Sequence, residues 1–252
     1  IYIGKSIHIK KRIEQHLRNN KSAKGLQMSQ EICRVEYELT GSELIAMLRE
    51  SVLIKEHKPI YNRKLRKSLF PYGLYDQQDF DGYIRLKIEN SAKQTAEPLI
   101  QFTSKKEAQH YLETVAERHE LCQKLCYLYP TQSACFHYTI QQCNGACVQE
   151  ETPAAYNERV QRFIDQVQFS GSSFFIIDKG RNKGEKSVVW IDKGIYKGFG
   201  YAPFHFHGKE PMHWARYINT EKENRDNKSI VSYFLRSDKN LKIVQLNALE
   251  TL

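Results

Sequence analysis

The start of the chain carries side chains that could bind and cleave a phosphodiester. Tyr2 and Lys5 lie on either side of a glycine in "IYIGKS". Arg12 and His16 follow four residues apart in "KKRIEQHL", a spacing that places them on one face of a helix. A phenol beside cations can accept a proton from water, and Arg suits paired contacts to phosphate oxygens. We therefore expect these side chains to converge on a phosphate.

Further along, a carboxylate lies where it needs a partner. Glu50 falls inside the apolar helical stretch 43–57, and Asn62 follows that stretch closely. A buried carboxylate requires a counter-charge or a metal ion. Together with Tyr2, Arg12 and the other cations, Glu50 completes the groups that metal-assisted phosphodiester hydrolysis requires.

The same opening permits another interpretation, because Gly-Lys-Ser also ends the phosphate loop of nucleotide hydrolases. That motif needs a glycine five positions before Gly4, which would precede residue 1. Ile1, Tyr2 and Ile3 would then form the turn around the phosphates, and bulky residues of this kind suit a strand better. We therefore favour a nuclease over a nucleotide hydrolase.

The charge distribution indicates a polyanionic partner. The chain has a formal net charge of +9, and residues 1–68 alone contain 15 Lys and Arg against 7 Glu, a net +8. A solvated basic face is the alternative, but such clustering favours nucleic acid. The cations expected to bind DNA phosphates are Lys10, Lys11, Arg63, Lys64, Arg66 and Lys67.

Five of the six cysteines lie in residues 122–147, which favours a metal site over disulfides in a reducing compartment. Cys135, Cys143 and Cys147 have the spacing C-x7-C-x3-C. Cys122 or Cys126 must supply a fourth ligand, and we favour Cys122. Zinc ribbons prefer C-x2-C pairs, which are absent, and thiolates also hold iron–sulfur clusters. Buried free thiols are the remaining alternative.

The periodicities predict an α+β fold in four regions. These are a small mixed α/β module over 1–68, a β-rich connector over 69–103, a Cys-rich helical region over 104–170, and an α+β C-terminal region of unknown role over 171–252. In the first module we expect strands at 1–3 and 34–40 and helices at 8–17 and 43–57, the second ending near Lys58 because Pro59 follows. Later strands are expected at 72–77, 82–89 and 98–103, and a hairpin about Lys193-Gly194.

Four segments together resemble the GIY-YIG nuclease domain, in the version found in UvrC-like excision endonucleases: "YIGKS", "KKRIEQHL", "LIAMLRESVLIKEHKPIYN" and "RKLRK". Their order and spacing match over about residues 1–68. The family's first strand, with its "GIY" or "GVY" tyrosine, is not in this sequence, which begins between the two halves of the motif. We therefore expect weaker cutting by this chain.

This resemblance implies a metal-dependent DNA endonuclease of nucleotide excision repair. Glu50 would hold one Mg²⁺ or Mn²⁺, Tyr2 would act as general base, and Asn62 would orient the site. Arg12 and His16, with Lys5, would hold the scissile phosphate. The segment "ACFHYTIQQCNGACV" resembles the UvrC stretch that ends in a Cys-rich motif, and implies a [4Fe-4S] cluster in preference to zinc.

Two alternatives stay open. The chain could be a binding module that docks on DNA or a repair partner without cutting. It could also be the accessory half of a proofreading-type exonuclease fusion, DNA polymerase III epsilon-like, although no exonuclease carboxylate motif is visible. The expected partners are DNA and other excision-repair or replication proteins. The apolar runs are too short to span a bilayer and no signal peptide is evident, so we expect a cytoplasmic protein without membrane contact.

Overall fold

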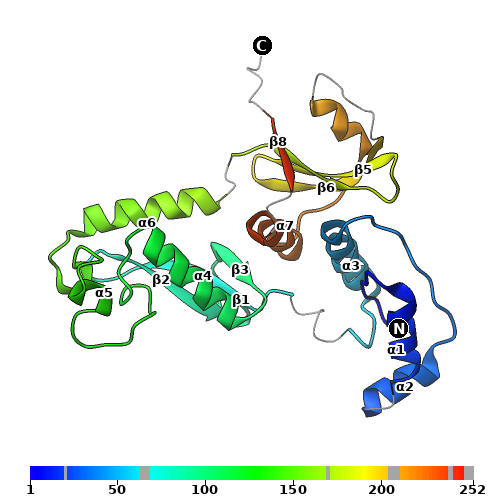
Figure 1. The fold of residues 1–252 in the computed structure, drawn as a ribbon, viewed down its shortest axis with the longest axis horizontal. Coiled ribbons are helices and arrows are strands. Elements are labelled where there is room, and N and C mark those ends of the chain that lie inside the picture. Colours follow the sequence, from blue (N-terminus) through cyan, green and yellow to red (C-terminus); the bar gives the residue numbers. More distant parts are fainter. Residues whose placement is uncertain (20–21, 63–68, 169–170, 204–210, 238–240, 247–252) are drawn as a thin grey trace. The chain divides into compact units, whose positions relative to one another are not determined.

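The chain leaves its first folded unit at residue 69 and returns to it at residue 172. In the computed structural model, which describes residues 1–19, 22–62, 69–168, 171–203, 211–237 and 241–246, unit 1 comprises Ile1–Leu69 with Ser172–Leu252, and unit 2 comprises Phe70–Gly171 (Figure 1). Both units combine helices with strands, which confirms the α+β class. The structure groups the predicted regions differently: the connector and the Cys-rich region form one unit, and the C-terminal region folds with the first module.

The first module is helical. It contains α1 (Ile9–Leu17), α2 (Ala23–Glu31) and α3 (Glu43–His57). The Ser42 hydroxyl caps α3 by accepting a hydrogen bond from the Ile45 N–H (3.3 Å). The helix ends at Lys58, whose left-handed φ of 45° precedes Pro59. The two helices expected from the sequence are therefore confirmed, and α2 is an addition.

The two strands expected in this module are not formed. Residues 1–3 and 34–40 are extended, but within the described part of 1–62 neither pairs with another strand. Extended backbone becomes a strand only when a neighbour completes its ladder. Val35, Tyr37 and Leu39, whose alternation suggested a covered face, are exposed.

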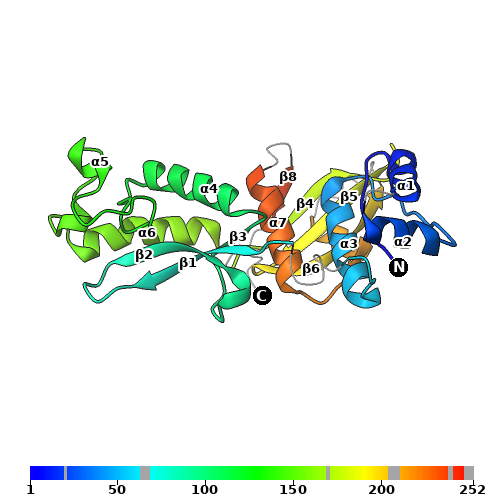
Figure 2. The same cartoon turned by 90° about the horizontal axis from the view of Figure 1, so that it is seen from below.

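Helix α3 is covered on two sides, which explains why much of its sequence before the last turn is apolar. Seven of its residues are buried, the carboxylate of Glu50 among them. The stripe that carries Glu43 and Glu50 lies next to the first module, where Glu43 forms an ion pair with Lys5. The neighbouring stripe, at 44, 48, 51 and 55, lies about 100° further round the helix, and its Lys55 contacts Asp226 of α7 (Arg225–Ser237). Figures 1 and 2 show α3 between α7 and α1 with α2.

An ion pair and a hydrogen bond of Lys55 fix the contact between α3 and α7. The Lys55 ammonium donates to the Asp226 carboxylate (2.8 Å) and to the Asn224 side-chain oxygen (2.6 Å). The same Asn224 oxygen accepts the backbone N–H groups of Asp226 (3.0 Å) and Asn227 (3.1 Å), so it caps α7.

The rest of unit 1 is an antiparallel sheet in the order β7-β6-β5-β4-β8. The predicted hairpin about Lys193-Gly194 joins β5 to β6, and both turn residues have positive φ (51° and 79°), as a tight two-residue turn requires. Phe175 packs on Trp190 and Trp214, with ring centroids 5.9 and 5.6 Å apart. The strands are β4 (Phe174–Lys179), β5 (Glu185–Asp192), β6 (Ile195–Pro203), β7 (Ile218–Thr220) and β8 (Lys242–Gln245).

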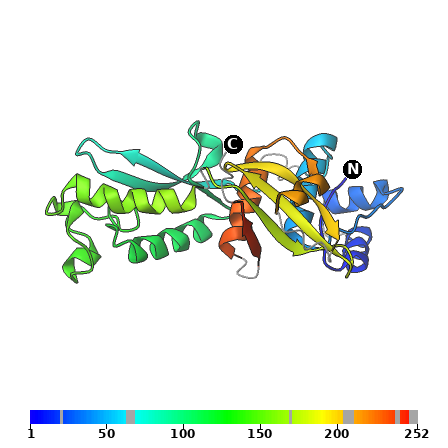
Figure 3. The same ribbon diagram turned by 90° about the horizontal axis from the view of Figure 1, so that it is seen from above.

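Unit 2 has one core shared by sheet and helices, which is why the connector and the Cys-rich region do not separate. Its antiparallel sheet has the order β2-β1-β3. Figure 3 shows α4 (Lys105–Arg118) and α6 (Pro153–Val167) on one face of that sheet. Leu74, Leu86, Leu112 and Phe163 meet in the core. The strands are β1 (Tyr72–Gln78), β2 (Ile84–Asn90) and β3 (Ile100–Phe102), and α5 (Phe136–Thr139) is a short turn of helix.

None of the helices that the structure describes combines the length and the apolar character needed to cross a membrane.

We predict that Gly41→Ala destabilises unit 1 by about 2 kcal/mol or more, because Gly41 has a φ of +78° and a Cβ there would lie 2.2 Å from the Gly180 carbonyl oxygen. Denaturant unfolding followed by tryptophan fluorescence measures this directly, since Trp190 and Trp214 both belong to unit 1. Gly184→Ala is the control, because its Cβ meets nothing closer than 3.4 Å. Equal midpoints for the two variants would contradict the proposed contact.

Candidate active site

Asn62 holds the segment that carries Tyr2. Its side-chain oxygen accepts the Ile3 N–H (2.9 Å) and its amide donates to the Ile3 carbonyl (2.6 Å). The Tyr61 N–H adds a bond to the Ile1 carbonyl (3.1 Å). Asn62 is only 3% exposed, so these bonds are shielded from water. Its role is to position the backbone next to Tyr2.

Gly4 allows the Tyr2 ring to fold back on the chain. A Cβ at Gly4 would lie 2.6 Å from the Tyr2 hydroxyl oxygen and 2.8 Å from a ring carbon. Any other residue would displace the ring, which gives a physical reason for the glycine in "YIGKS".

Tyr2 lies between the two polar residues of α1. The Arg12 Nη2 group donates to the Tyr2 hydroxyl (2.8 Å), and the Tyr2 and His16 ring centroids are 4.6 Å apart. Within the described residues, Arg12 Nε and His16 Nε2 are buried and have no hydrogen-bond partner. Buried polar groups are usually paired, so these two nitrogens are suited to the oxygens of a bound anion.

Glu50 adds a buried carboxylate to this cluster. Its side chain lies in α3, and the residue is only 8% exposed. Burial raises the Glu50 pKa above its usual value, and the charges of Lys5 and Arg12 offset only part of that effect. The negative charge of Glu50 is thus only partly balanced by the neighbouring cations. A divalent cation bound to this carboxylate would neutralise that charge.

His16 is neutral near pH 7 in this environment. Burial lowers the pKa of its imidazole, and the neighbouring Arg12 charge lowers it further. The imidazole therefore carries one N–H and one acceptor nitrogen, and Arg12 and Lys5 supply the positive charge at the site.

The structure thus brings together Tyr2, Lys5, Arg12, His16 and Glu50, with Asn62 behind them. Lys10 and Lys11 are exposed on α1, and the predicted basic residues Arg63, Lys64, Arg66 and Lys67 lie outside the described residues. The ion pair of Glu43 with Lys5 was not predicted from the sequence. The signal was the seven-residue spacing from Glu43 to Glu50, which places both on one stripe of α3.

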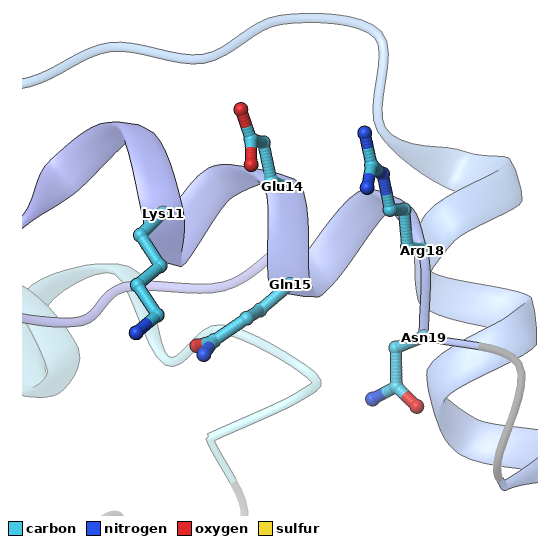
Figure 4. Close-up of a pocket in the computed structure, with 5 residues that line it drawn as sticks. All are labelled: Lys11, Glu14, Gln15, Arg18 and Asn19. Atoms are coloured by element: carbon cyan, nitrogen blue, oxygen red, sulfur yellow. The ribbon is translucent and has the colours of Figure 1, made fainter.

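A shallow hollow lies on another face of α1, away from the face that carries Arg12 and His16. Lys11, Glu14, Gln15, Arg18 and Asn19 line it (Figure 4). The helical spacing separates this hollow from the site, so it is not the pocket of the cluster described above.

The cysteines of unit 2 form a second cluster. The sulfurs of Cys122, Cys135 and Cys147 lie within 4.8 Å of one another. Cys143 Sγ lies 3.8 Å from Cys135 Sγ, as does Cys122 Sγ. The four cysteines favoured from the sequence therefore gather at one place, while all are unbridged.

Their thiols differ in acidity. Burial raises the Cys122 pKa well above its usual range and raises that of Cys143 to about 11. Burial acts in the same direction on Cys135, but the Tyr138 N–H and the neighbouring thiols outweigh it and lower its pKa. Cys126 is fully buried with a pKa of about 12, which makes it an inert core thiol.

One arginine holds the loops that carry this cluster. Arg159 on α6 forms an ion pair with the Glu151 carboxylate, including an Nη2 bond of 2.8 Å. It also donates to the carbonyls of His119 (3.1 Å) and Glu120 (3.1 Å), just after α4. The two ends of the Cys-rich segment are therefore tied to the same side chain.

The molecule is thus an α+β protein in which Arg12 and His16 have buried nitrogens without a hydrogen-bond partner among the described residues, beside a buried carboxylate, and which also has a four-cysteine cluster. Residues 1–63 match the family model described as the UvrC-like GIY-YIG domain, and residues 71–166 match that of the UvrC/Cho excinuclease middle domain. The chain belongs to the UvrC-like GIY-YIG family, which confirms the resemblance found from the sequence.

Three relatives illustrate the similarity. Excinuclease cho of Salmonella typhi is 32% identical over 174 residues, 67% of this chain and 57% of its own length. Excinuclease cho of Escherichia coli (strain K12) is 29% identical over 67% of this chain and 56% of its own length. UvrABC system protein C of Malacoplasma penetrans (strain HF-2) is 29% identical over 78% of this chain and 33% of its own length.

The chain therefore spans only a little over half of the length of the Excinuclease cho relatives. No solved structure gives a significant match. Neither matching family model extends into residues 172–252, and neither describes a proofreading exonuclease, so that alternative gains no support.

We predict that Glu50→Gln stabilises unit 1 at neutral pH. A carboxyl with a raised folded pKa contributes full stability below its unfolded pKa of about 4.5 and loses it as the pH rises through the folded value. The gain over the parent should therefore appear above about pH 4.5, grow towards pH 7 and vanish in acid. Tryptophan-monitored unfolding across this range measures it.

Glu56→Gln, an exposed position on the same helix, serves as the control and should follow the parent at every pH. A Glu50→Gln protein that is less stable than the parent at pH 7 would mean that Lys5 and Arg12 fully compensate the carboxylate.

Proposed function

We propose that this protein cleaves phosphodiester bonds of DNA during excision repair, as an endonuclease that depends on a divalent cation. The observation that carries the proposal is the convergence of Tyr2, Arg12, His16 and Glu50. The relatives support it, since they are called Excinuclease cho and UvrABC system protein C.

Tyr2 is the proton acceptor in this scheme. Its hydroxyl oxygen accepts a hydrogen bond from Arg12 Nη2, which orients the phenol and stabilises negative charge on that oxygen. Gly4 and Asn62 fix the ring and the backbone beside it. In its deprotonated form, Tyr2 would take a proton from an adjacent water molecule as the water oxygen attacks phosphorus, and the phenolate would thereby return to the phenol.

The scissile phosphate binds at the unpaired nitrogens. Arg12 Nε and His16 Nε2 have no hydrogen-bond partner among the described residues, and Lys5 adds positive charge close to Glu50. These donors stabilise the extra negative charge of the phosphorane-like transition state more than that of the ground state.

Glu50 would hold the cation. Its buried, partly compensated carboxylate fits Mg²⁺ or Mn²⁺, which prefer oxygen ligands. When bound there, the ion would supply Lewis-acid stabilisation of the leaving oxygen.

We also propose that Cys122, Cys135, Cys143 and Cys147 hold a metal centre. A tetrahedral ion with metal–sulfur bonds of about 2.3 Å needs sulfurs about 3.8 Å apart, and two of the pairs have this separation. A four-iron cluster is larger and would require the sulfurs to spread. The spacing thus favours a single ion, while the resemblance to UvrC favours iron–sulfur.

We expect Glu50→Gln to lower the nicking of supercoiled plasmid in Mg²⁺ or Mn²⁺ by at least about a hundredfold, because it removes the only buried carboxylate ligand of the described cluster. Glu56→Gln should nick like the parent. Mn²⁺ should also raise the thermal midpoint of the parent and leave that of Glu50→Gln unchanged, a readout that does not depend on turnover.

Equal nicking by parent and Glu50→Gln would refute this mechanism. A parent that binds DNA but never nicks it, with either cation, would instead identify a binding module.

The metal centre is tested by metal analysis and absorption spectra after anaerobic purification. We expect Cys135→Ser to lose the metal, because Cys135 lies beside two other sulfurs. Cys126→Ala should keep it, because that thiol packs in the core. A brown parent would identify iron–sulfur, and a colourless one with zinc would identify a single ion. A metal-free parent would leave four packed thiols.

A further inference from the structure

The C-terminal region carries a positive charge of its own. Residues 172–252 contain 14 Lys and Arg against 9 Asp and Glu, a net +5, whereas residues 69–171 contain 9 against 13, a net −4. The excess of positive charge is therefore not confined to residues 1–68. Unit 1 as a whole is positively charged, including the region 172–252, which neither matching family model covers.

The hairpin between β4 and β5 lies against the segment that begins α3. Gly41 and Gly180 meet backbone to backbone, since a Cβ on Gly41 would lie 2.2 Å from the Gly180 carbonyl oxygen. The Tyr201 hydroxyl donates to the Thr40 carbonyl (3.2 Å). Two residues after Gly41, Glu43 pairs with Lys5 of the candidate site. The hairpin is thus attached at the end of α3 that adjoins the site.

The Glu185 carboxylate of the hairpin turn is already neutralised. Arg181 donates to both oxygens of Glu185, from Nε (2.9 Å) and Nη2 (2.6 Å), and its guanidinium lies 4.0 Å from the Tyr201 ring centroid. These contacts hold the exposed turn against β6.

Two lysines of the same hairpin have side chains that are available to bind a ligand. Lys179 and Lys183 are exposed, and within the described residues neither forms an ion pair. The adjacent Asp178 carboxylate accepts the backbone N–H of Lys179 (2.7 Å). Exposed ammonium groups beside a turn that already has its own contacts can reach phosphates at a lower cost in ordering.

We propose that the β4–β5 hairpin binds the phosphate backbone of DNA through Lys179 and Lys183, and so extends the DNA surface of the nuclease from the first module onto the C-terminal sheet. The proposal rests on the proposed function, because it assumes DNA at the candidate site. Duplex DNA carries one charge per about 1.7 Å of axis, so DNA that reaches the site presents many more phosphates than the one being cut. The positive charge of the C-terminal region complements them.

The test is charge reversal in the full chain. We expect Lys179→Glu/Lys183→Glu to weaken binding of a short fluorescent duplex about tenfold or more, measured in EDTA so that no cutting occurs. The slope of log K against log salt should fall by about 1 per lysine. In nicking assays the KM should rise and kcat should stay unchanged, because neither lysine belongs to the catalytic cluster.

Lys105→Glu/Lys106→Glu is the matched control, since it makes the same change in charge at two exposed positions of α4 in unit 2. It should bind like the parent. Lys179→Gln/Lys183→Gln removes the two positive charges without adding negative ones. It should show the same slope change, and it replaces the Glu variant if charge reversal impairs folding.

Unchanged DNA affinity and an unchanged salt slope in the hairpin variants would overturn the proposal. An equal loss of DNA affinity in the α4 control would also overturn it, because the effect would then come from the overall charge of the protein. Either result leaves the proposed function standing if Glu50→Gln still abolishes nicking. Nicking that survives Glu50→Gln would refute the mechanism while leaving the binding result interpretable.

Discussion

The burial of the Glu50 carboxylate is the constraint on which unit 1 depends. A carboxylate removed from water loses solvation, and its raised pKa shows that Lys5 and Arg12 restore only part of it. That arrangement persists only if the surrounding elements hold it. Helix α3 does so because seven of its residues are buried and it is covered both by the first module and by α7. The stability of this packing supports a site that is itself electrostatically unfavourable.

The elements around α3 serve the same constraint. Lys55 lies on the stripe of α3 that contacts α7, and it joins that stripe to the capped start of α7 through Asp226 and Asn224. Asn62, just beyond the end of the helix, returns to hold Ile3 and thereby the segment that carries Tyr2. The carboxylate and the segment that carries the phenol are therefore positioned by α3 and by Asn62 beyond its end, while α1 supplies the guanidinium. This accounts for residues far apart in sequence meeting at one place.

Unit 2 follows a different principle. Its sheet, α4 and α6 share a single core, while the cysteines lie in a segment with little regular structure. Such a segment needs side-chain interactions to fix its position. Arg159 provides them by bonding both to the Glu151 carboxylate and to the carbonyls after α4. The cysteine cluster thus adjoins the core of unit 2, and a metal centre there would add to the stability of its loops.

The sequence by itself predicted the helices α1 and α3, the strands of the sheet in unit 2, the hairpin between β5 and β6, and the residues proposed for the candidate site. Helical spacing identified Arg12 with His16, and an isolated carboxylate in an apolar helix identified Glu50, because both signals are local. The strands expected at 1–3 and 34–40 failed because a strand depends on a partner, and alternation of Val35, Tyr37 and Leu39 cannot supply one. Only the tertiary structure decided that Glu43 pairs with Lys5, that residues 70–171 form one unit, and that α7 of the C-terminal region packs against a second side of the Glu50 helix. Those contacts join residues up to 169 positions apart, as Lys55 and Asn224 show, and no local pattern encodes a pairing over that distance.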